Sequence, residues 1–152
     1  DLVAEVEASL EPGVAVVLKL HPMDALNAML DSTLGRISIL RAGDPQASVE
    51  ELMARSRCLV TDYSSAAIDY LTLGRPIGYY CPDRSGYSRG FVEGVEEPYF
   101  AAGIMLEGAA ELARFFNRPV ATGNRGSSLS TNRDDRAAER LWSHLGGESE
   151  AQ

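Results

Sequence analysis

The sequence predicts an α/β fold in which a parallel β-sheet is covered by helices on both sides. Apolar runs of strand length alternate along the chain with segments of helical spacing, and the connections between them are only a few residues long. The clearest strand, residues 14–20, is an almost uninterrupted apolar run, which is typical of a strand buried on both faces. These observations place the chain in the α/β class.

The first half of the chain contains the alternating elements. Strands are expected at residues 14–20, 37–40, 58–61 and 76–80. Helices are expected at residues 2–10, 23–30, 49–56 and 65–73. Pro12 and Gly13 end the first of these helices, Ser48 is the expected N-cap of the third, and Gly74 closes the fourth.

The second half follows a different pattern. Residues 82–99 include glycines and aromatic residues and form a stretch longer than a typical connection, which favours a functional role. Helices are expected at residues 109–116 and 134–145, with a surface loop at 118–132 between them. We expect one domain over residues 1–145 and a disordered tail at residues 146–152.

Composition limits the classes of function. The 152 residues are 45% hydrophobic and 24% charged, which suits a single globular domain. The formal net charge is −8, so the overall field attracts neither nucleic acid nor an anionic membrane, and any phosphate must be bound locally. The basic residues are arginines apart from Lys19, and arginine suits bidentate phosphate contacts, although most surface arginines are simply solvated.

The cysteines and the chain ends give further expectations. Cys58 and Cys81 lie at or beside apolar runs, where buried free thiols are expected rather than a disulfide framework. The sequence contains no signal-peptide h-region and no apolar run long enough to span a bilayer, so we expect a soluble, intracellular chain. It begins at Asp1 without a methionine, which suggests a piece of a longer protein.

The residues directly after each strand are the candidates for a ligand site, because ligands of such sheets collect beyond the carboxyl ends of the strands. The turn after the strand at 58–61 is the most informative, since Asp62, Ser64 and Ser65 offer hydroxyls and free amides to an anion. The alternative is that Ser64 or Ser65 only caps the next helix, and for either serine alone this is the commoner role. Asp69 lies one helical turn after Ser65 and can face the same ligand.

Three further places could contribute to that ligand site. His21 follows a strand and precedes a proline that restrains the turn, so it is either a ligand group or a structural hydrogen-bonding residue. Arg41 and Asp44 follow the strand at 37–40, and Arg89 in the long stretch could clamp a phosphate or lie in a packed surface loop. No Cys, His or carboxylate cluster has the spacing of a metal site.

Four segments together resemble the CDP-glycerol glycerophosphotransferase family in order and spacing. They are KLHP at 19–22, TDYSSAAIDY at 61–70, GRPIGYY at 74–80 and YSRGF at 87–91. The resemblance covers about residues 14–145, and TNRDDRAAER at 131–140 looks like the closing segment of the family. It implies the C-terminal half of a GT-B fold, which consists of two Rossmann-like halves, with the nucleotide donor held mainly by this half.

The resemblance also implies roles for the candidate residues. His21, Ser64, Ser65 and Arg89 would contact the pyrophosphate of CDP-glycerol, with His21 stabilising the phosphate or the transition state. Asp69 would lie near the ribose or the glycerol, and residues 41–44 would form the wall beside the cytosine. The serine-containing turn, Asp62 included, would belong to the same donor site.

The implied reaction is attack of an acceptor hydroxyl on the β-phosphorus of CDP-glycerol, with CMP leaving, in the synthesis of teichoic acid or a related cell-envelope polymer. We expect no resident metal or other cofactor. The expected partners are the nucleotide donor and a polymer or lipid-linked acceptor, without nucleic acid, and the full-length protein would lie peripherally at the cytoplasmic face of the membrane.

The same resemblance places the catalytic base in an N-terminal half and a central strand before Asp1, so we expect weak donor binding and no transfer by these 152 residues alone. Two other functions stay open. One is a nucleotide-sugar glycosyltransferase or a sugar 2-epimerase-like protein of the same architecture. The other is a non-catalytic α/β binding module. A receiver-type module is disfavoured because it requires a lysine late in the chain, whereas the only lysine is Lys19.

Overall fold

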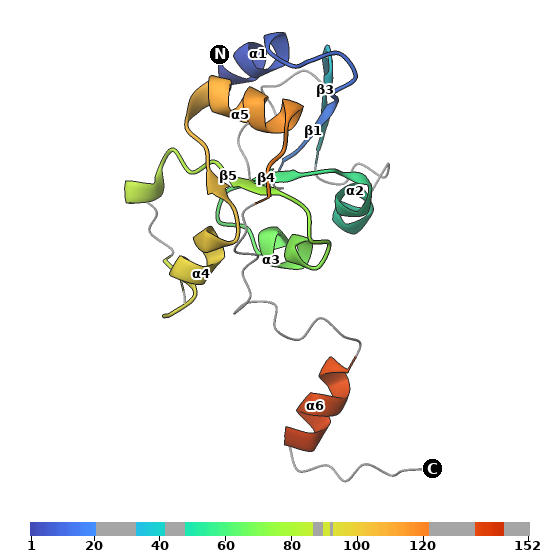
Figure 1. The fold of residues 1–152 in the computed structure, drawn as a ribbon, viewed down its shortest axis with the longest axis vertical. Coiled ribbons are helices and arrows are strands. Elements are labelled where there is room, and N and C mark those ends of the chain that lie inside the picture. Colours follow the sequence, from blue (N-terminus) through green and yellow to red (C-terminus); the bar gives the residue numbers. More distant parts are fainter. Residues whose placement is uncertain (21–32, 42–47, 87–89, 92, 122–135, 145–152) are drawn as a thin grey trace.

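The structure is a computed structural model, and it describes residues 1–20, 33–41, 48–86, 90–91, 93–121 and 136–144. Two three-stranded β-sheets lie in the middle of the main body, with α1 and α5 on one side and α2 and α3 on the other (Figure 1). The elements in chain order are α1 (Leu2–Ala8), β1 (Val16–Lys19), β2 (Thr33–Leu34), β3 (Ile37–Leu40), α2 (Val49–Arg55), β4 (Leu59–Thr61), α3 (Ala66–Leu71), β5 (Ile77–Tyr79), the 3₁₀ turn η2 (Arg84–Gly86), α4 (Glu96–Ala101), β6 (Ile104–Met105), α5 (Gly108–Asn117) and α6 (Ala137–His144).

The first sheet has the strand order β1-β3-β2. β1 and β3 run parallel, with Lys19 opposite Leu40, whereas β2 and β3 are antiparallel. Gly35 lies in the tight turn between β2 and β3 at a φ of 54°, a backbone conformation that glycine adopts without a steric cost. β2 is absent from the sequence prediction because a two-residue strand leaves no periodic signal.

The second sheet has the order β4-β5-β6, and all its strands are parallel. Thr61 pairs with Tyr79, and Tyr79 pairs with Met105 in the neighbouring strand. β5 is the central strand and is buried along its whole length. The parallel arrangement confirms the predicted α/β class and brings the carboxyl ends of the three strands to one edge.

The prediction for residues 14–20 is wrong in one respect, since β1 is not buried on both faces. The side chain of Val17 is 48% exposed. β1 pairs with β3 along one edge only, and within the described residues no strand lies along its other edge. Because side chains project from the faces of a strand, Val17 lies on a face of β1 that stays open to solvent. The single parallel sheet expected from the sequence is instead divided into two.

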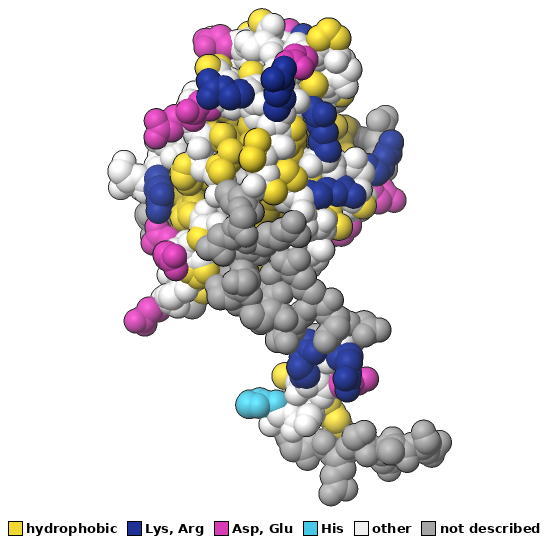
Figure 2. Space-filling view, viewed as in Figure 1, with side chains coloured by type: hydrophobic (Ala, Val, Ile, Leu, Met, Phe, Trp, Pro, Cys, Tyr) yellow, Lys and Arg dark blue, Asp and Glu magenta, His cyan; other side chains and the backbone are white. Residues whose placement is uncertain are grey.

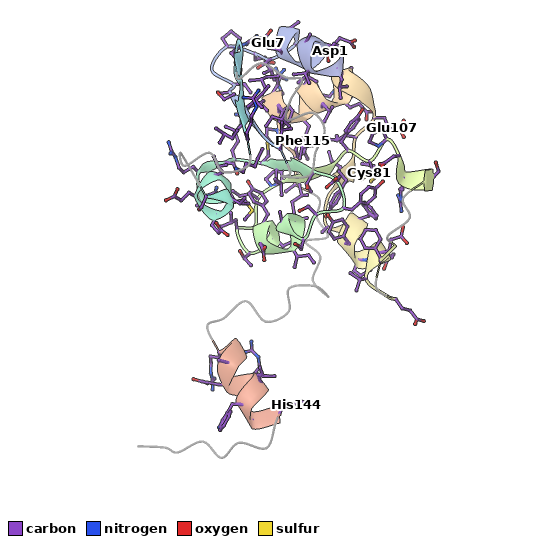
Figure 3. All side chains as sticks on the ribbon, turned by 180° about the vertical axis from the view of Figure 1, so that it is seen from behind. Asp1, Glu7, Cys81, Glu107, Phe115 and His144 are labelled. Carbon is purple, nitrogen blue, oxygen red and sulfur yellow. The ribbon has the colours of Figure 1, made fainter. Side chains whose placement is uncertain are left out.

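Two hydrophobic cores hold these elements together. The leucine core consists of Val6, Leu10, Ile37, Leu106, Leu112 and Phe115, and partly buried side chains from both sheets pack against it. Figure 3 shows Phe115 between α5 and the sheets. The tyrosine core consists of Ala67, Tyr70, Leu71, Ile77, Tyr79, Cys81, Tyr99 and Ala102, and it joins α3, β5 and α4. The cores therefore lie against different helices.

Local sequence signals account for several boundaries. Ser48 begins α2 with a capping box, in which its side chain accepts from the Glu51 amide while the Glu51 carboxylate accepts from the Ser48 amide. The chain turns after α3 at Gly74, where φ is 64°. Both outcomes confirm the predicted signals, although α3 itself ends at Leu71, earlier than expected.

Besides β2, three elements were not expected from the sequence. The predicted long connection over residues 82–99 contains η2 and the start of α4. Pro98 argues against a helix, but it lies in the first turn of α4, where its missing amide hydrogen has no partner in any helix. β6 was also missed because it has only two residues. The segment is thus partly helical.

The predicted helices at 109–116 and 134–145 correspond to α5 and α6. Figure 1 shows α6 apart from the main body. The helix expected at residues 23–30, most of the loop expected at 118–132 and the tail at 146–152 lie outside the described residues. Among the residues that the structure describes, none of the helices has the length and apolar character needed to cross a bilayer.

Candidate functional site

The carboxyl ends of β4 and β5 meet at one edge of the second sheet. In register, Thr61 lies opposite Tyr79, so the residues that follow the two strands emerge side by side. The Tyr63 hydroxyl donates a hydrogen bond to Asp83 Oδ1 at 3.0 Å, which links the segment after β4 with the segment after β5. This is the convergence of strand ends that the sequence predicts for this pair of strands.

The turn between β4 and α3, which we call the serine turn (residues 62–65), is open to solvent. Asp62, Ser64 and Ser65 are exposed, whereas the Tyr63 side chain is half-buried. The Ser64 hydroxyl oxygen accepts a hydrogen bond from the Ala66 amide at 3.3 Å. Ser65 occupies the N-cap position of α3, yet its side chain makes no capping hydrogen bond. The capping alternative therefore describes Ser64 better than Ser65.

Asp69 lies one turn along α3, as predicted. Its amide approaches the Ser65 carbonyl at 3.4 Å, and its side chain is exposed. The structure thus brings together Asp62, Ser64, Ser65 and Asp69, all on the serine turn and the first turns of α3. Asp62, Ser64 and Ser65 lie within four consecutive positions of the sequence, so they are close together in any fold.

The carboxyl ends of β1 and β3 form the second pair of strand ends. The Leu20 amide donates to the Leu40 carbonyl at 3.1 Å, which continues the parallel ladder one step beyond β1. Lys19 Nζ donates to the Arg41 carbonyl at 3.2 Å, and the Arg41 side chain is half-buried. Arg41 is thus held at the end of β3, in the sheet that does not carry the serine turn.

Three predicted site residues, His21, Asp44 and Arg89, lie outside the described residues. The structure therefore joins the end of β1 with that of β3, and the end of β4 with that of β5. A shared ligand for all four strand ends stays a prediction. Within the described ranges, the His, Cys, Asp and Glu side chains include no group of three that could hold a metal ion.

Sequence reasoning missed Tyr99, the residue that makes the longest-range contact with the serine turn. Its hydroxyl lies 2.8 Å from the Ser64 carbonyl and 3.0 Å from the Asp62 carbonyl. Tyr99 is only 2% exposed, on the second turn of α4. The one sequence signal was the unusual length of residues 82–99, which pointed to a functional segment but not to this residue.

Burial sets the protonation of the groups around the turn. Desolvation raises the pKa of the Tyr63 hydroxyl, and its hydrogen bond to Asp83 raises it further. Desolvation likewise raises the pKa of the Cys81 thiol. Tyr63 is therefore a protonated donor to Asp83 at neutral pH, and Cys81 is a neutral core residue rather than a nucleophile. The sequence prediction of a buried free thiol is confirmed at Cys81.

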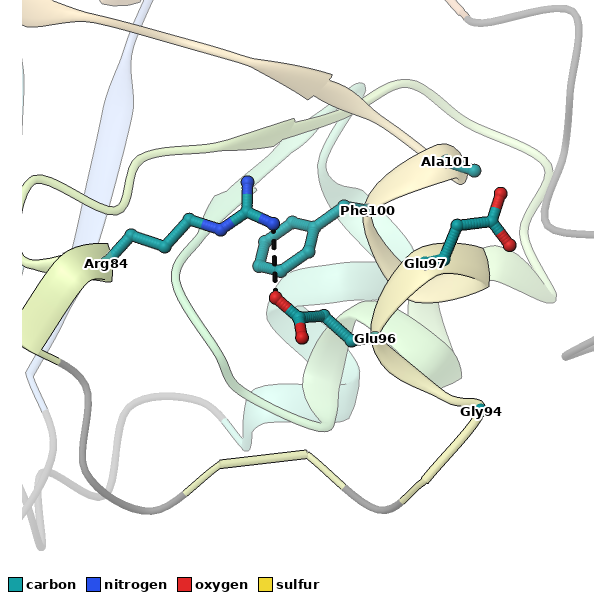
Figure 4. A pocket seen from close by; sticks show the side chains of 6 residues that line it. All are labelled: Arg84, Gly94, Glu96, Glu97, Phe100 and Ala101. Atoms are coloured by element: carbon teal, nitrogen blue, oxygen red, sulfur yellow. Dashed lines mark hydrogen bonds and ion pairs between the residues drawn. The ribbon is translucent and has the colours of Figure 1, made fainter.

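A hollow of about 540 Å³ lies between η2 and α4 (Figure 4). The Arg84 guanidinium stacks over the Phe100 ring, 4.2 Å from its centroid, and Arg84 Nη2 lies 3.1 Å from Glu96 Oε1. Glu97 adds a second carboxylate to the lining. Because the arginine is already paired and two carboxylates line the hollow, it does not suit a pyrophosphate.

On the face drawn in Figure 2, the lysine and arginine side chains of the described residues lie scattered at the top, right and left of the main body and on α6, with acidic side chains among them. Hydrophobic side chains reach the surface in the middle of the same face. A phosphate site on this chain therefore depends on local donors, in agreement with the net charge of −8.

Comparison with known proteins gives two matches. Residues 3–140 match the protein family described as CDP-Glycerol:Poly(glycerophosphate) glycerophosphotransferase. A teichoic acid ribitol-phosphate primase of Bacillus spizizenii (strain ATCC 23059 / NRRL B-14472 / W23) is 50% identical to the chain over 40 residues. That match covers 26% of this chain and 10% of the length of the relative. No solved structure matches the chain.

Proposed function

The chain belongs to the CDP-glycerol:poly(glycerophosphate) glycerophosphotransferase family, and from this premise we propose that it forms the donor-binding half of a GT-B transferase. The proposed reaction moves glycerol phosphate from CDP-glycerol to an acceptor hydroxyl during the synthesis of teichoic acid or a related polymer. Support comes from the family match over residues 3–140 and from the parallel strands that end beside the serine turn.

The observation that carries the proposal is the state of Ser65. Its side chain is exposed beyond the end of β4 and makes no capping hydrogen bond, although it occupies the position where serines usually cap. A hydroxyl that does not serve the helix can donate to a phosphate oxygen. Ser65 is therefore the described residue best placed to contact the donor pyrophosphate.

The proposed chemistry depends on hydrogen-bond donors. Charge accumulates on the phosphoryl oxygens as the acceptor oxygen attacks the β-phosphorus and the bond to CMP breaks. We assign stabilisation of that charge to Ser64, Ser65, His21 and Arg89, with Arg89 making the strongest bond because it is charged. Asp69 is assigned to the ribose or glycerol hydroxyls, and Arg41 with Asp44 to the side of the cytosine.

The relative named as a teichoic acid ribitol-phosphate primase supports a second candidate, the transfer of ribitol phosphate. The same serine turn would hold the pyrophosphate in either case, since the two donors differ only beyond the phosphates. In the full-length protein we place this domain at the cytoplasmic face of the membrane, with membrane contact made by other parts of the protein.

A binding titration tests the proposal. The 152-residue chain is titrated by calorimetry with CDP-glycerol, CDP-ribitol, CMP and a UDP-sugar, with and without a divalent metal ion. We expect both CDP-alditols to bind more tightly than CMP, and the UDP-sugar to bind most weakly. Preference for the UDP-sugar would instead favour a nucleotide-sugar glycosyltransferase, and absence of binding by every nucleotide would favour a non-catalytic module.

A pair of serine substitutions tests the assignment of Ser65. Ser65→Ala should weaken CDP-glycerol binding by about fivefold, which corresponds to roughly 1 kcal/mol, and leave the free energy of unfolding unchanged. Ser48→Ala is the matched control, because it removes the capping box of α2 and should cost about 1 kcal/mol of stability without a change in affinity. Loss of stability with unchanged affinity in Ser65→Ala would return Ser65 to a capping role.

A further inference from the structure

Tyr99 has no part in the chemistry proposed above, but its contacts with the serine turn indicate a structural role in the donor site. We propose that Tyr99 is the positioning residue of the donor site: its hydroxyl fixes the serine turn, and its ring packs against Phe91, which also contacts Tyr63 of the turn. The inference rests on the proposed function for the identity of the ligand. The contacts that carry it are independent of that function.

The hydroxyl of Tyr99 connects α4 to the serine turn across the chain. It donates to the Ser64 carbonyl at 2.8 Å and to the Asp62 carbonyl at 3.0 Å, so one hydrogen is shared between the carbonyls on either side of Tyr63. The Ser64 carbonyl also accepts from the Ala67 amide at 3.2 Å, at the start of α3. The bond therefore fixes the backbone at the residues that would contact the donor.

Tyr99 is itself held by β5. The Tyr79 hydroxyl donates to the Tyr99 carbonyl at 2.7 Å inside the protein, and Tyr79 is completely buried. The two rings lie 4.9 Å apart between centroids. Since β5 is the central strand of its sheet, the position of the serine turn is set from the rigid part of the domain through two tyrosines.

The ring of Tyr99 also contacts the segment after η2. Phe91 lies 5.2 Å from Tyr99 between ring centroids, and it packs edge-on against Tyr63 at 6.3 Å. Phe91 thus contacts both Tyr63 and Tyr99, and these rings couple the serine turn to α4 a second time.

A buried tyrosine can also serve stability alone, and Tyr70 separates the two roles. Tyr70 is completely buried in the same core, and its hydroxyl lies 3.0 Å from Ser56 Oγ and 3.2 Å from the Ser56 carbonyl. Its partner follows α2 and does not belong to the serine turn. Tyr70→Phe therefore removes the same chemical group from the same core while leaving the turn in contact with Tyr99.

The experiment compares Tyr99→Phe and Tyr70→Phe in the 152-residue chain. Amide hydrogen exchange at Ala66 and Ala67 reports the serine turn, because these amides donate to the Ser64 hydroxyl oxygen and the Ser64 carbonyl. Calorimetric titration with CDP-glycerol reports the ligand site. We expect Tyr99→Phe to speed exchange in the turn and to weaken CDP-glycerol binding, each by about threefold to tenfold. Tyr70→Phe should leave both quantities at the wild-type values although both variants lose stability.

Tyr79→Phe serves as a second variant. It should change the exchange rates and the affinity in the same direction as Tyr99→Phe, but by less. It removes the hydrogen bond that holds the Tyr99 backbone and keeps the bonds from the Tyr99 hydroxyl to the serine turn. Wild-type exchange and affinity in Tyr99→Phe, or equal changes in Tyr70→Phe, would overturn the inference. Absence of CDP-glycerol binding by the wild-type chain would instead overturn the proposed function, and the exchange rates would still decide whether Tyr99 holds the turn.

Discussion

The leucine core and the tyrosine core bury similar numbers of apolar side chains but hold their elements in different ways. In the leucine core, the side chains through which α1 and α5 contact the sheets are aliphatic apart from Phe115 and cannot form hydrogen bonds. Beside this core, the Arg36 guanidinium donates to the backbone carbonyls of Glu7 and Leu10. In the tyrosine core, Tyr70, Tyr79 and Tyr99 each place a hydroxyl on a backbone carbonyl. The side chains of the leucine core contribute apolar contacts alone. The hydroxyls of the tyrosine core also fix the backbone positions to which they donate.

This difference explains where the candidate site lies. A hydrophobic contact depends little on orientation, whereas a buried hydroxyl stabilises only the arrangement that satisfies it. The serine turn lies beside the tyrosine core, whose hydroxyls fix backbone positions by hydrogen bonds. A site that needs hydrogen-bond donors at fixed positions is therefore built next to this core. The leucine core should therefore govern stability, and the tyrosine core should govern ligand affinity in addition.

The largest expected effect is the loss of stability in Phe115→Ala. Phe115 is 3% exposed in the leucine core, and truncation of such a residue costs about 3–5 kcal/mol. Val120→Ala, at a side chain that is 64% exposed, should change the free energy of unfolding by less than about 0.5 kcal/mol. Urea unfolding measures both. The affinity of folded Phe115→Ala for CDP-glycerol should match the wild type, and a parallel loss of affinity would break the proposed division between the cores.

A second, smaller effect is expected where glycines allow β5 and β6 to approach the cores. A methyl group at Gly103 would lie 2.6 Å from the Ile77 carbonyl oxygen, which is backbone and cannot move aside. A methyl group at Gly78 would lie 2.5 Å from Leu106 Cδ1, the end of a side chain that can rotate. We expect Gly103→Ala to lose about 1–3 kcal/mol and Gly78→Ala to lose less.

Gly86→Ala is the matched control for this pair, since nothing lies within 4 Å of the position of its added methyl group. Thermal or urea unfolding should show no loss for Gly86→Ala, and a small gain is expected because alanine restricts the unfolded chain. Equal losses in Gly103→Ala and Gly78→Ala would mean that the side chains of the leucine core are as immobile as the backbone, contrary to the comparison above.

Much of the fold was predictable because its signals are local. The strand at 37–40, the N-cap at Ser48 and the turn at Gly74 depend on neighbouring residues, and the structure confirms them. The division into two sheets depends on which strands pair with each other, and the exposure of Val17 depends on what covers its face of β1. Both depend on residues far away in the sequence, so they could not be predicted from the apolar run at residues 14–20.

The candidate site likewise contains residues that local sequence signals predict and one residue that they do not. Ser64, Ser65 and Asp69 could be found from the sequence because a strand, a turn and a helix follow each other within a few residues. Tyr99 could not, since it reaches the turn from a helix that begins beside a proline and lies more than thirty residues further along the chain. The positions of His21, Asp44 and Arg89 in the site stay predictions.

The last expected effect is a stepwise loss of stability at alkaline pH. Burial raises the pKa of the Cys58 thiol, which packs against the leucine core, from 9.0 to about 11, with Arg57 opposing the shift. Burial likewise raises the pKa of Tyr79 in the tyrosine core from 10.0 to about 12. In each window the folded state binds more protons than the unfolded state, so stability falls as pH rises.

The loss should therefore begin near pH 9 with Cys58 and steepen above pH 10 with Tyr79. Urea unfolding in half-unit steps between pH 8 and pH 11 measures the slope. Cys58→Ala should reduce the decline between pH 9 and pH 10, where Cys81 still contributes because burial raises the pKa of its thiol as well, and should keep the steeper part that comes from Tyr79. An unchanged decline in Cys58→Ala would show that the Cys58 thiol is solvated in the folded protein.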